Sequence, residues 1–161
     1  MKVIGIDPGL SGAIAIMEDK KVLKTYDMPV MAEGKKNKRQ LNSALLVSLL
    51  KENIVSHEEV AVVVEQVNAM PGQGVTSMFN FGQTFGAIKG VCAALDLPIF
   101  FVRPSKWKKH FELINSSKDS SRTKAIEMYP KLSNQLTKKK DVNKSDAILI
   151  ARYYSETRLT E

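Results

Sequence analysis

Short apolar runs separated by turn residues make up the N-terminal part of the chain. Residues 3–6 form one run, which ends at Asp7, and residues 13–17 form the next. The residues between them are rich in Pro, Gly and Ser, which favour tight turns. Runs of β-branched residues bounded in this way are typical of buried strands. The pattern predicts a β-hairpin with Asp7 at the exposed end of its first strand.

Three more apolar runs predict further strands. Residues 21–28 end at Pro29 and give a third strand. Residues 60–64, VAVVV, favour a strand buried on both faces, as in a parallel sheet. Residues 97–102 form the last run. Helical patterns lie between these runs, so the sequence predicts an α/β fold with a mixed sheet.

Apolar residues recur at three- and four-residue spacing in four segments, which predicts amphipathic helices. The expected helices cover residues 40–53, 76–95, 122–129 and 144–156. Asn143 is the expected N-cap of the last helix, which places Asp146 in its first turn.

Three glycines, Gly82, Gly86 and Gly90, recur every four residues in the second helical segment. Each weakens an isolated helix by about 1 kcal/mol relative to Ala, so the stripe indicates that another backbone approaches closely. Packing onto the sheet is the favoured interpretation, and contact with a second copy of the chain in a homodimer is the alternative.

The composition fits one globular domain spanning residues 1–161, with 43% hydrophobic residues. A net charge of +7 indicates a polyanionic partner, and nucleic acid is favoured over a membrane because no basic amphipathic helix stands out.

No run approaches the roughly 18 apolar residues of a membrane span, and no secretory signal is evident. Cys92 is the single cysteine, which excludes an internal disulfide and a cysteine-rich zinc site and suits the cytoplasm.

One segment combines basic and aromatic residues suited to nucleic acid, and one further aromatic residue is a candidate by itself. Residues 105–111, SKWKKHF, interleave Lys108 and other lysines with Trp107. The alternative is a short helix with Trp107 buried and the lysines exposed to solvent. Phe79 is a candidate for stacking on an unpaired base, and core packing is its alternative.

Basic residues also gather in polar parts of the chain. Lys118, Arg122 and Lys124 flank the start of a predicted helix, where a phosphate is favoured. A further basic run at 138–140 precedes Asp141, and the loop at 33–39 is rich in lysine. A solvated surface is the alternative for that loop.

Four acids are candidates for chemistry: Asp7, Glu65, Asp141 and Asp146. Asp7 and Glu65 each end a predicted strand, and on parallel neighbouring strands their repulsion would be costly without a cation. The alternatives are turn capping for Asp7, a solvated strand end for Glu65 and helix capping for Asp146.

An all-carboxylate site suits Mg²⁺, or Mn²⁺ in its place, rather than zinc. In a basic chain it indicates phosphodiester hydrolysis, in which two ions activate water and stabilise the leaving 3′ oxygen. Neither His57 nor His110 shows the spacing of a metal or nucleophile site.

Three motifs resemble the RuvC family of Holliday junction resolvases: GIDPGLSGA at 5–13, VVEQV at 63–67 and KSDAILIARY at 144–153. Arg103-Pro104 through Trp107-Lys108, with SRTKAIEMYP at 121–130, resembles the phage-type branch of that family. The resemblance spans nearly the whole chain in the right order.

The resemblance implies an RNase H-like α/β fold with helices on both faces of the sheet. It also implies a homodimer and Mg²⁺-dependent paired nicking of four-way DNA junctions, in a host cytoplasm if the chain is phage-encoded. It assigns metal ligation to Asp7, Glu65 and Asp146, and DNA contact to Lys108. Many members have an acid or His where this chain has Asn143, and phage-type members match Asp141, which we therefore expect as the fourth ligand. The alternative is that Asn143 completes the site as a weak ligand.

Two other functions remain open from the sequence. The chain is a non-catalytic branched-DNA-binding protein if its acids only cap turns. An actin-type or sugar-kinase nucleotide binder opens with a similar turn, but that fold normally needs two related domains, so we expect no nucleotide cofactor.

Overall fold

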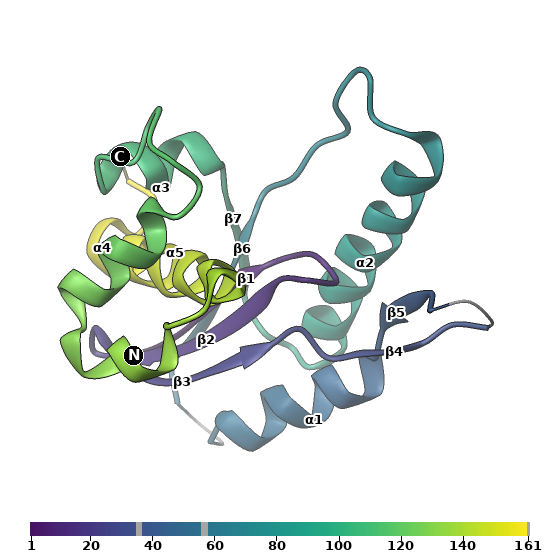
Figure 1. Ribbon diagram of the computed structural model, residues 1–161. Helices are drawn as coiled ribbons and strands as arrows, with labels where there is room; N and C mark the ends of the chain where they lie inside the picture. The colour runs from purple at the N-terminus through teal and green to yellow at the C-terminus, as the bar shows by residue number, and fades with distance from the viewer. Residues whose placement is uncertain (35–36, 56–57, 161) are drawn as a thin grey trace.

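A five-stranded mixed sheet forms the centre of the molecule (Figure 1). The computed structural model describes residues 1–34, 37–55 and 58–160, so His57 and part of the predicted loop at 33–39 lie outside the described residues. The strand order is β3-β2-β1-β6-β7. The strands are β1 (Lys2–Asp7), β2 (Ala13–Glu18), β3 (Lys21–Asp27), β6 (Val60–Glu65) and β7 (Ile99–Val102). β1, β2 and β3 pair antiparallel, whereas β1, β6 and β7 pair parallel, as the sequence predicts.

The central strands are buried on both faces. In β1, Val3 belongs to one core cluster, while Ile4 and Ile6 belong to the other. β6 divides in the same way, with Val63 on one face and Val64 on the opposite face. Alternate residues of a strand point to opposite faces, so an uninterrupted apolar run supplies both cores.

Helices cover both faces of the sheet (Figure 1). One face carries α3 (Pro104–His110), α4 (Ser120–Met128) and α5 (Val142–Thr157), and the other carries α1 (Ser43–Asn53) and α2 (Val75–Ala94). α5 packs closely on β1, because a Cβ at Gly5 would lie 2.2 Å from the carbonyl oxygen of Ala147. Gly5 therefore lets the last helix lie directly over the first strand.

The first predicted helix begins later than its apolar pattern indicates. Residues 39–41 form β5 (Arg39–Leu41), which pairs with β4 (Val30–Ala32) in a separate two-stranded sheet. The Asn42 side chain then accepts a 3.0 Å hydrogen bond from the Leu45 N–H and caps α1. The prediction of a helix from residue 40 is wrong because this cap fixes the start at Ser43.

The last helix begins earlier than predicted. Two short 3-10 helices, η1 (Pro130–Gln135) and η2 (Lys139–Asp141), precede it, and η2 runs directly into α5. Asn143 therefore lies inside the helix rather than at its N-cap, and its amide Nδ2 donates to the Lys140 carbonyl at 3.3 Å.

The glycine stripe of α2 faces away from the sheet. A Cβ at Gly82, Gly86 or Gly90 would meet no atom within 4 Å among the described residues. The favoured prediction, that this stripe packs onto the sheet, is wrong. Ile88 and Cys92 bury the opposite side of α2 instead.

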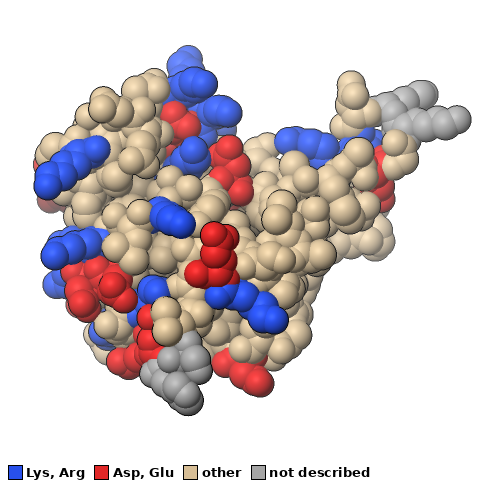
Figure 2. Space-filling model, turned by 90° about the horizontal axis from the view of Figure 1, so that it is seen from below, with Lys and Arg blue, Asp and Glu red and all other residues tan. Residues whose placement is uncertain are grey.

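Charge is distributed unevenly over the surface. The face seen in Figure 2 mixes basic and acidic side chains over its left part and its centre, with a mainly uncharged stretch to the right of the centre. The net charge alone therefore does not mark this face as a binding surface. Each described helix is too short or too polar to cross a bilayer.

Candidate metal centre

Asp7 and Glu65 end two neighbouring parallel strands. Ile6 pairs with Val64, and one residue further each strand reaches its carboxylate. The turn after Asp7 is tight: Gly12 N–H donates to the Gly9 carbonyl at 3.0 Å, and a Cβ at Gly12 would lie 2.0 Å from the Asp7 carbonyl. The expected side-by-side placement of the two acids at one sheet edge is confirmed.

Asp146 comes to the same place from α5. It is the fifth residue of the helix, immediately before Ala147, whose carbonyl lies against Gly5 of β1. The first turn of α5 contains no acid, so the capping interpretation of Asp146 is wrong. Among the described residues, no hydrogen bond from the turn reaches the Asp7 side chain, so turn capping does not explain that residue either.

The three carboxylates repel one another in a buried setting. Burial, followed by the charges of Asp146 and Glu65, raises the pKa of Asp7 to about 7. Burial and then the charge of Glu65 raise the pKa of Asp146 to about 6. Burial also raises the pKa of Glu65. Negative charge at this edge is therefore undercompensated, which favours binding of a cation.

Two lysines partly offset the negative charge. Lys108 from α3 and Lys118 from the following loop both act to lower the pKa values of Asp7 and Asp146. The ammonium of Lys108 also lies 5.4 Å from the centre of the Trp107 ring. Two of the three lysines predicted to contact DNA, Lys108 and Lys118, thus lie next to the acids.

Trp107 holds Glu65 directly. Its indole Nε1 donates a 2.7 Å hydrogen bond to Glu65 Oε2, and its ring is fully buried. The solvated-end interpretation of Glu65 is wrong, and the structural alternative for Trp107, burial in a short helix, is confirmed. The pairing was missed from the sequence, although a buried indole N–H requires an acceptor.

Ser121, at the start of α4, is a second contact that sequence reasoning missed. Its hydroxyl is buried and lowers the pKa of Asp146, although its geometry falls outside that of a regular hydrogen bond. The polar segment before α4 gave no signal that separated this serine from its neighbours.

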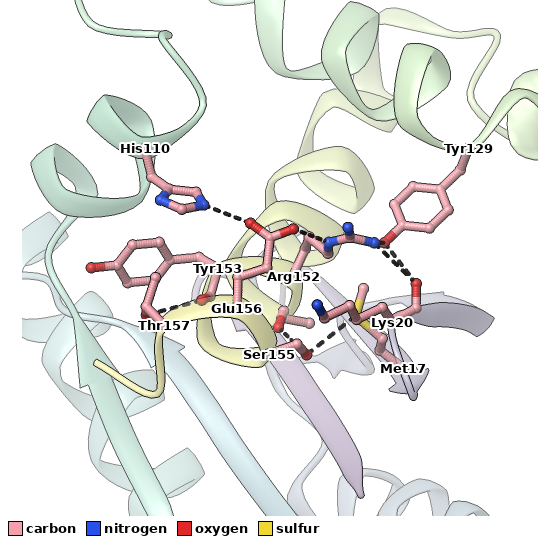
Figure 3. A network of polar contacts seen from close by, with 10 residues as sticks. Met17, Lys20, His110, Tyr129, Arg152, Tyr153, Ser155, Glu156 and Thr157 are labelled. Atoms are coloured by element: carbon pink, nitrogen blue, oxygen red, sulfur yellow. Dashed lines mark hydrogen bonds and ion pairs between the residues drawn. The ribbon is translucent and has the colours of Figure 1, made fainter. Parts of the chain in front are cut away.

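A polar network fixes α3 to α5 (Figure 3). His110 Nε2 lies 2.6 Å from Glu156 Oε2, and Arg152 Nε donates to Glu156 Oε1 at 2.5 Å. Arg152 also donates to the Tyr129 hydroxyl at 3.1 Å, which in turn donates to the Lys20 carbonyl at 3.0 Å. Because α3 carries Trp107 and Lys108, this network holds both residues in place over the acidic edge.

Asp141 is buried in a different contact. Its Oδ2 accepts a 2.7 Å hydrogen bond from the Lys138 N–H, and its charge adds to the rise in the pKa of Arg122. It is not among the described charges that shift the pKa values of Asp7 and Asp146. Its role as a fourth ligand stays a prediction, and its observed role is to close the turn before α5.

Three other predicted DNA contacts have no described interaction with Asp7, Glu65 or Asp146. The Arg122 guanidinium donates two 2.8 Å bonds to Asp119 and one 3.0 Å bond to the Leu136 carbonyl, which braces the chain. Lys124 lies 3.9 Å from Glu127 on α4. Phe79 is 65% exposed, so its core alternative is wrong. DNA contact by these residues stays a prediction.

The donor set fits a hard divalent cation. Asp7, Glu65 and Asp146 offer only oxygen ligands, and burial together with their mutual repulsion raises the pKa values of Asp7 and Asp146, which a bound cation would offset. In the described part of the chain, no three His, Cys, Asp or Glu side chains already enclose a single ion position. A cation would therefore draw these carboxylates together rather than enter a finished cage.

The strand order, the helices on both faces and the acidic strand ends define a RuvC-like, RNase H-like α/β fold. Thermus thermophilus RuvC in complex with a Holliday junction substrate superposes with a TM-score of 0.63 and 18% identity, covering 99% of this chain and 96% of that one. A second Thermus thermophilus RuvC structure superposes with a TM-score of 0.58 and 18% identity, covering 98% of this chain and 95% of that one. No family model and no curated protein matches the sequence. The predicted fold class is confirmed.

Proposed function

We propose that the chain is a metal-dependent endonuclease that resolves four-way and other branched DNA junctions by paired nicking. The observation that carries the proposal is the coupling of Asp7, Glu65 and Asp146 at one edge of a RuvC-like sheet, with Lys108 and Lys118 beside them. A neighbour with this fold is described in complex with a Holliday junction substrate, which supports branched DNA as the substrate class.

The residues divide the work by chemistry. Asp7, Glu65 and Asp146 hold Mg²⁺, or Mn²⁺ in its place, and Asp141 is the proposed fourth ligand. When bound, the metal supplies an activated water and stabilises the leaving 3′ oxygen. Lys108 and Lys118 bind DNA phosphates beside the acids, and Trp107 fixes the orientation of Glu65.

We assign the chain to the phage-type branch on the segment from Arg103 through Lys108 and on residues 121–130. The structure adds a physical reason for one residue of that pattern. Trp107 supplies the hydrogen bond to Glu65, so a tryptophan directly before Lys108 serves the metal site as well as the core.

We infer that the exposed face of α2 pairs two copies of the chain. The stripe of Gly82, Gly86 and Gly90 is open, and Val75 and Phe79 expose 80% and 65% of their surface. Small residues beside exposed apolar ones allow two helices to approach closely, and paired nicking requires two active sites.

Gly86→Gln places a long side chain on this face and is expected to yield a monomer in sedimentation velocity. Ser48→Gln on α1 is the control and is expected to leave the dimer intact.

A non-catalytic branched-DNA-binding protein is the second candidate. It is favoured by the finding that the described carboxylates do not already enclose an ion. A synthetic four-way junction and a linear duplex of the same sequence separate the two functions. The nuclease predicts symmetric nicks in the junction with Mg²⁺ and none with EDTA. Tight binding without nicks in either Mg²⁺ or Mn²⁺ would instead establish the binding protein.

A further inference from the structure

A cavity of about 500 Å³ lies beside the acidic edge and shares Lys118 with the site described above. It opens between the loop that precedes α4 and the turn that leads into α5. Its lining combines three lysines with one acidic, two polar and one apolar residue: Ser117, Lys118, Asp119, Lys139, Lys140, Val142 and Asn143. Most of its charge comes from the basic run at 138–140, which the metal site does not use.

Arg122 braces both walls of this cavity. Its guanidinium donates two 2.8 Å bonds to the Asp119 carboxylate on one wall. On the other side it donates a 3.0 Å bond to the Leu136 carbonyl, just before the segment that carries Lys139 and Lys140. The walls are thus linked before any ligand arrives, which reduces the entropy lost on binding.

The same contact leaves the cavity positive. Asp119 is its one acidic lining residue, and the Arg122 pair neutralises that carboxylate, whose pKa is lowered by the bond. Lys118, Lys139 and Lys140 then remain as cations around the opening, because all three side chains are exposed. Three ammonium groups in a lining whose one carboxylate is already paired with Arg122 favour an anion.

The cavity adjoins the three carboxylates. Asn143 lines it and lies three residues before Asp146 on α5, so the two side chains share a face of the helix about one turn apart. Lys118 also lines it and acts on the charges of Asp7 and Asp146. An anion held here would therefore neighbour a phosphodiester at the acidic edge.

We propose that this cavity, with Lys139 and Lys140 as its principal ligands, binds a phosphodiester of the DNA backbone. The bound phosphodiester is the one adjacent to the phosphodiester that is cut. The inference rests on the proposed function, since it needs a DNA strand at the acidic edge. Ammonium groups bind phosphates as point charges without reading bases, so the cavity fixes the position of the strand and not its sequence.

The test compares two double variants with the same change in charge. Lys139→Ala/Lys140→Ala removes two of the three cavity lysines, and Lys21→Ala/Lys24→Ala removes two exposed lysines of β3. Lys21 pairs with Glu18, at the end of the sheet opposite Asp7. Binding of a four-way junction is measured in Ca²⁺ from 50 to 300 mM salt. Ethylation interference maps the phosphates that each protein needs, and thermal melting confirms that both variants fold.

The cavity variant is expected to bind about tenfold more weakly than the control pair at 100 mM salt. Its slope of log affinity against log salt is expected to fall by about 1 to 2, and interference is expected to disappear at phosphates adjoining the nick. Equal junction affinity, equal salt dependence and the same ethylation interference in the two variants would overturn the cavity assignment. The proposed nuclease function would be unaffected by that result. Failure of the unaltered protein to bind any branched DNA would overturn the proposed function itself and the cavity with it.

Discussion

The indole Nε1 of Trp107 donates a 2.7 Å hydrogen bond to Oε2 of Glu65 and joins α3 to the end of β6. The ring is fully buried, so the donor has little freedom to turn away. One oxygen of the carboxylate is held by the indole, and the other, for which the described residues supply no hydrogen bond, can coordinate a cation. The basic helix that brings Lys108 to the site thus also orients a proposed ligand.

Trp107→Phe removes this donor and keeps an aromatic ring in the core. We expect the affinity for Mn²⁺ to fall by about 10- to 100-fold, because partners that orient a metal ligand typically contribute that much. Electron paramagnetic resonance of free Mn²⁺ measures this without DNA. Phe111→Leu, a buried change at the end of the same helix, is the matched control and is expected to retain the affinity. Unchanged Mn²⁺ affinity in Trp107→Phe would remove the positioning role.

The raised pKa of Asp7 predicts how stability depends on pH. An aspartate whose pKa rises from 3.8 to about 7 on folding stays protonated in the fold while it ionises in the unfolded chain. The unfolded state then binds fewer protons, so stability falls as pH rises through this window. Between pH 5 and pH 7 the loss is about 2 to 3 kcal/mol for this one group.

Urea unfolding in EDTA at pH 5 and pH 7 tests this dependence. Asp7→Asn removes the titrating group, so its free energy of unfolding is expected to fall less than that of the unaltered protein over this range. Saturating Mg²⁺ is expected to restore stability at pH 7 more than at pH 5, because the cation binds the ionised form. Parallel pH profiles for the two proteins in EDTA would contradict the buried, coupled carboxylates.

Two glycines are expected to respond in opposite ways to replacement by alanine. At Gly5 the new Cβ would lie 2.2 Å from the Ala147 carbonyl oxygen, so Gly5→Ala forces α5 away from β1 and lowers the melting temperature strongly. At Gly86 the space is open, and Gly86→Ala stabilises the monomer by up to about 1 kcal/mol through helix propensity. Thermal melting at low protein concentration compares them. A loss of stability in Gly86→Ala under those conditions would contradict the open face of α2.

The sheet and the acidic edge were predictable because their signals are local. A β-branched run ending in an acid fixes both the strand and the position of Glu65, and the turn after Asp7 does the same for β1. Parallel pairing then brings the two acids together without further information. Asp146 needed the family resemblance, because its local pattern equally suited a helix cap.

The contacts between distant segments were not predictable. The bond from Trp107 to Glu65 joins residues 42 positions apart, and no spacing rule encodes it. The orientation of the α2 glycines depends on which side of the helix meets the sheet, and Ile88 with Cys92 decides that. The late start of α1 depended on the pairing of β5 with β4, which gives residues 39–41 a better partner than the helix.

The rate at which Asp7→Asn nicks a saturating four-way junction in Mg²⁺, relative to the unaltered protein, tests the central claim most directly. Asp7 is the proposed ligand with the largest rise in pKa, whereas lysines supply the affinity for DNA. We predict that the variant binds the junction with unchanged or slightly higher affinity and that its nicking falls by at least about 1000-fold. Nicking at an unchanged rate by Asp7→Asn would contradict the assignment of this acidic edge as the metal and catalytic site.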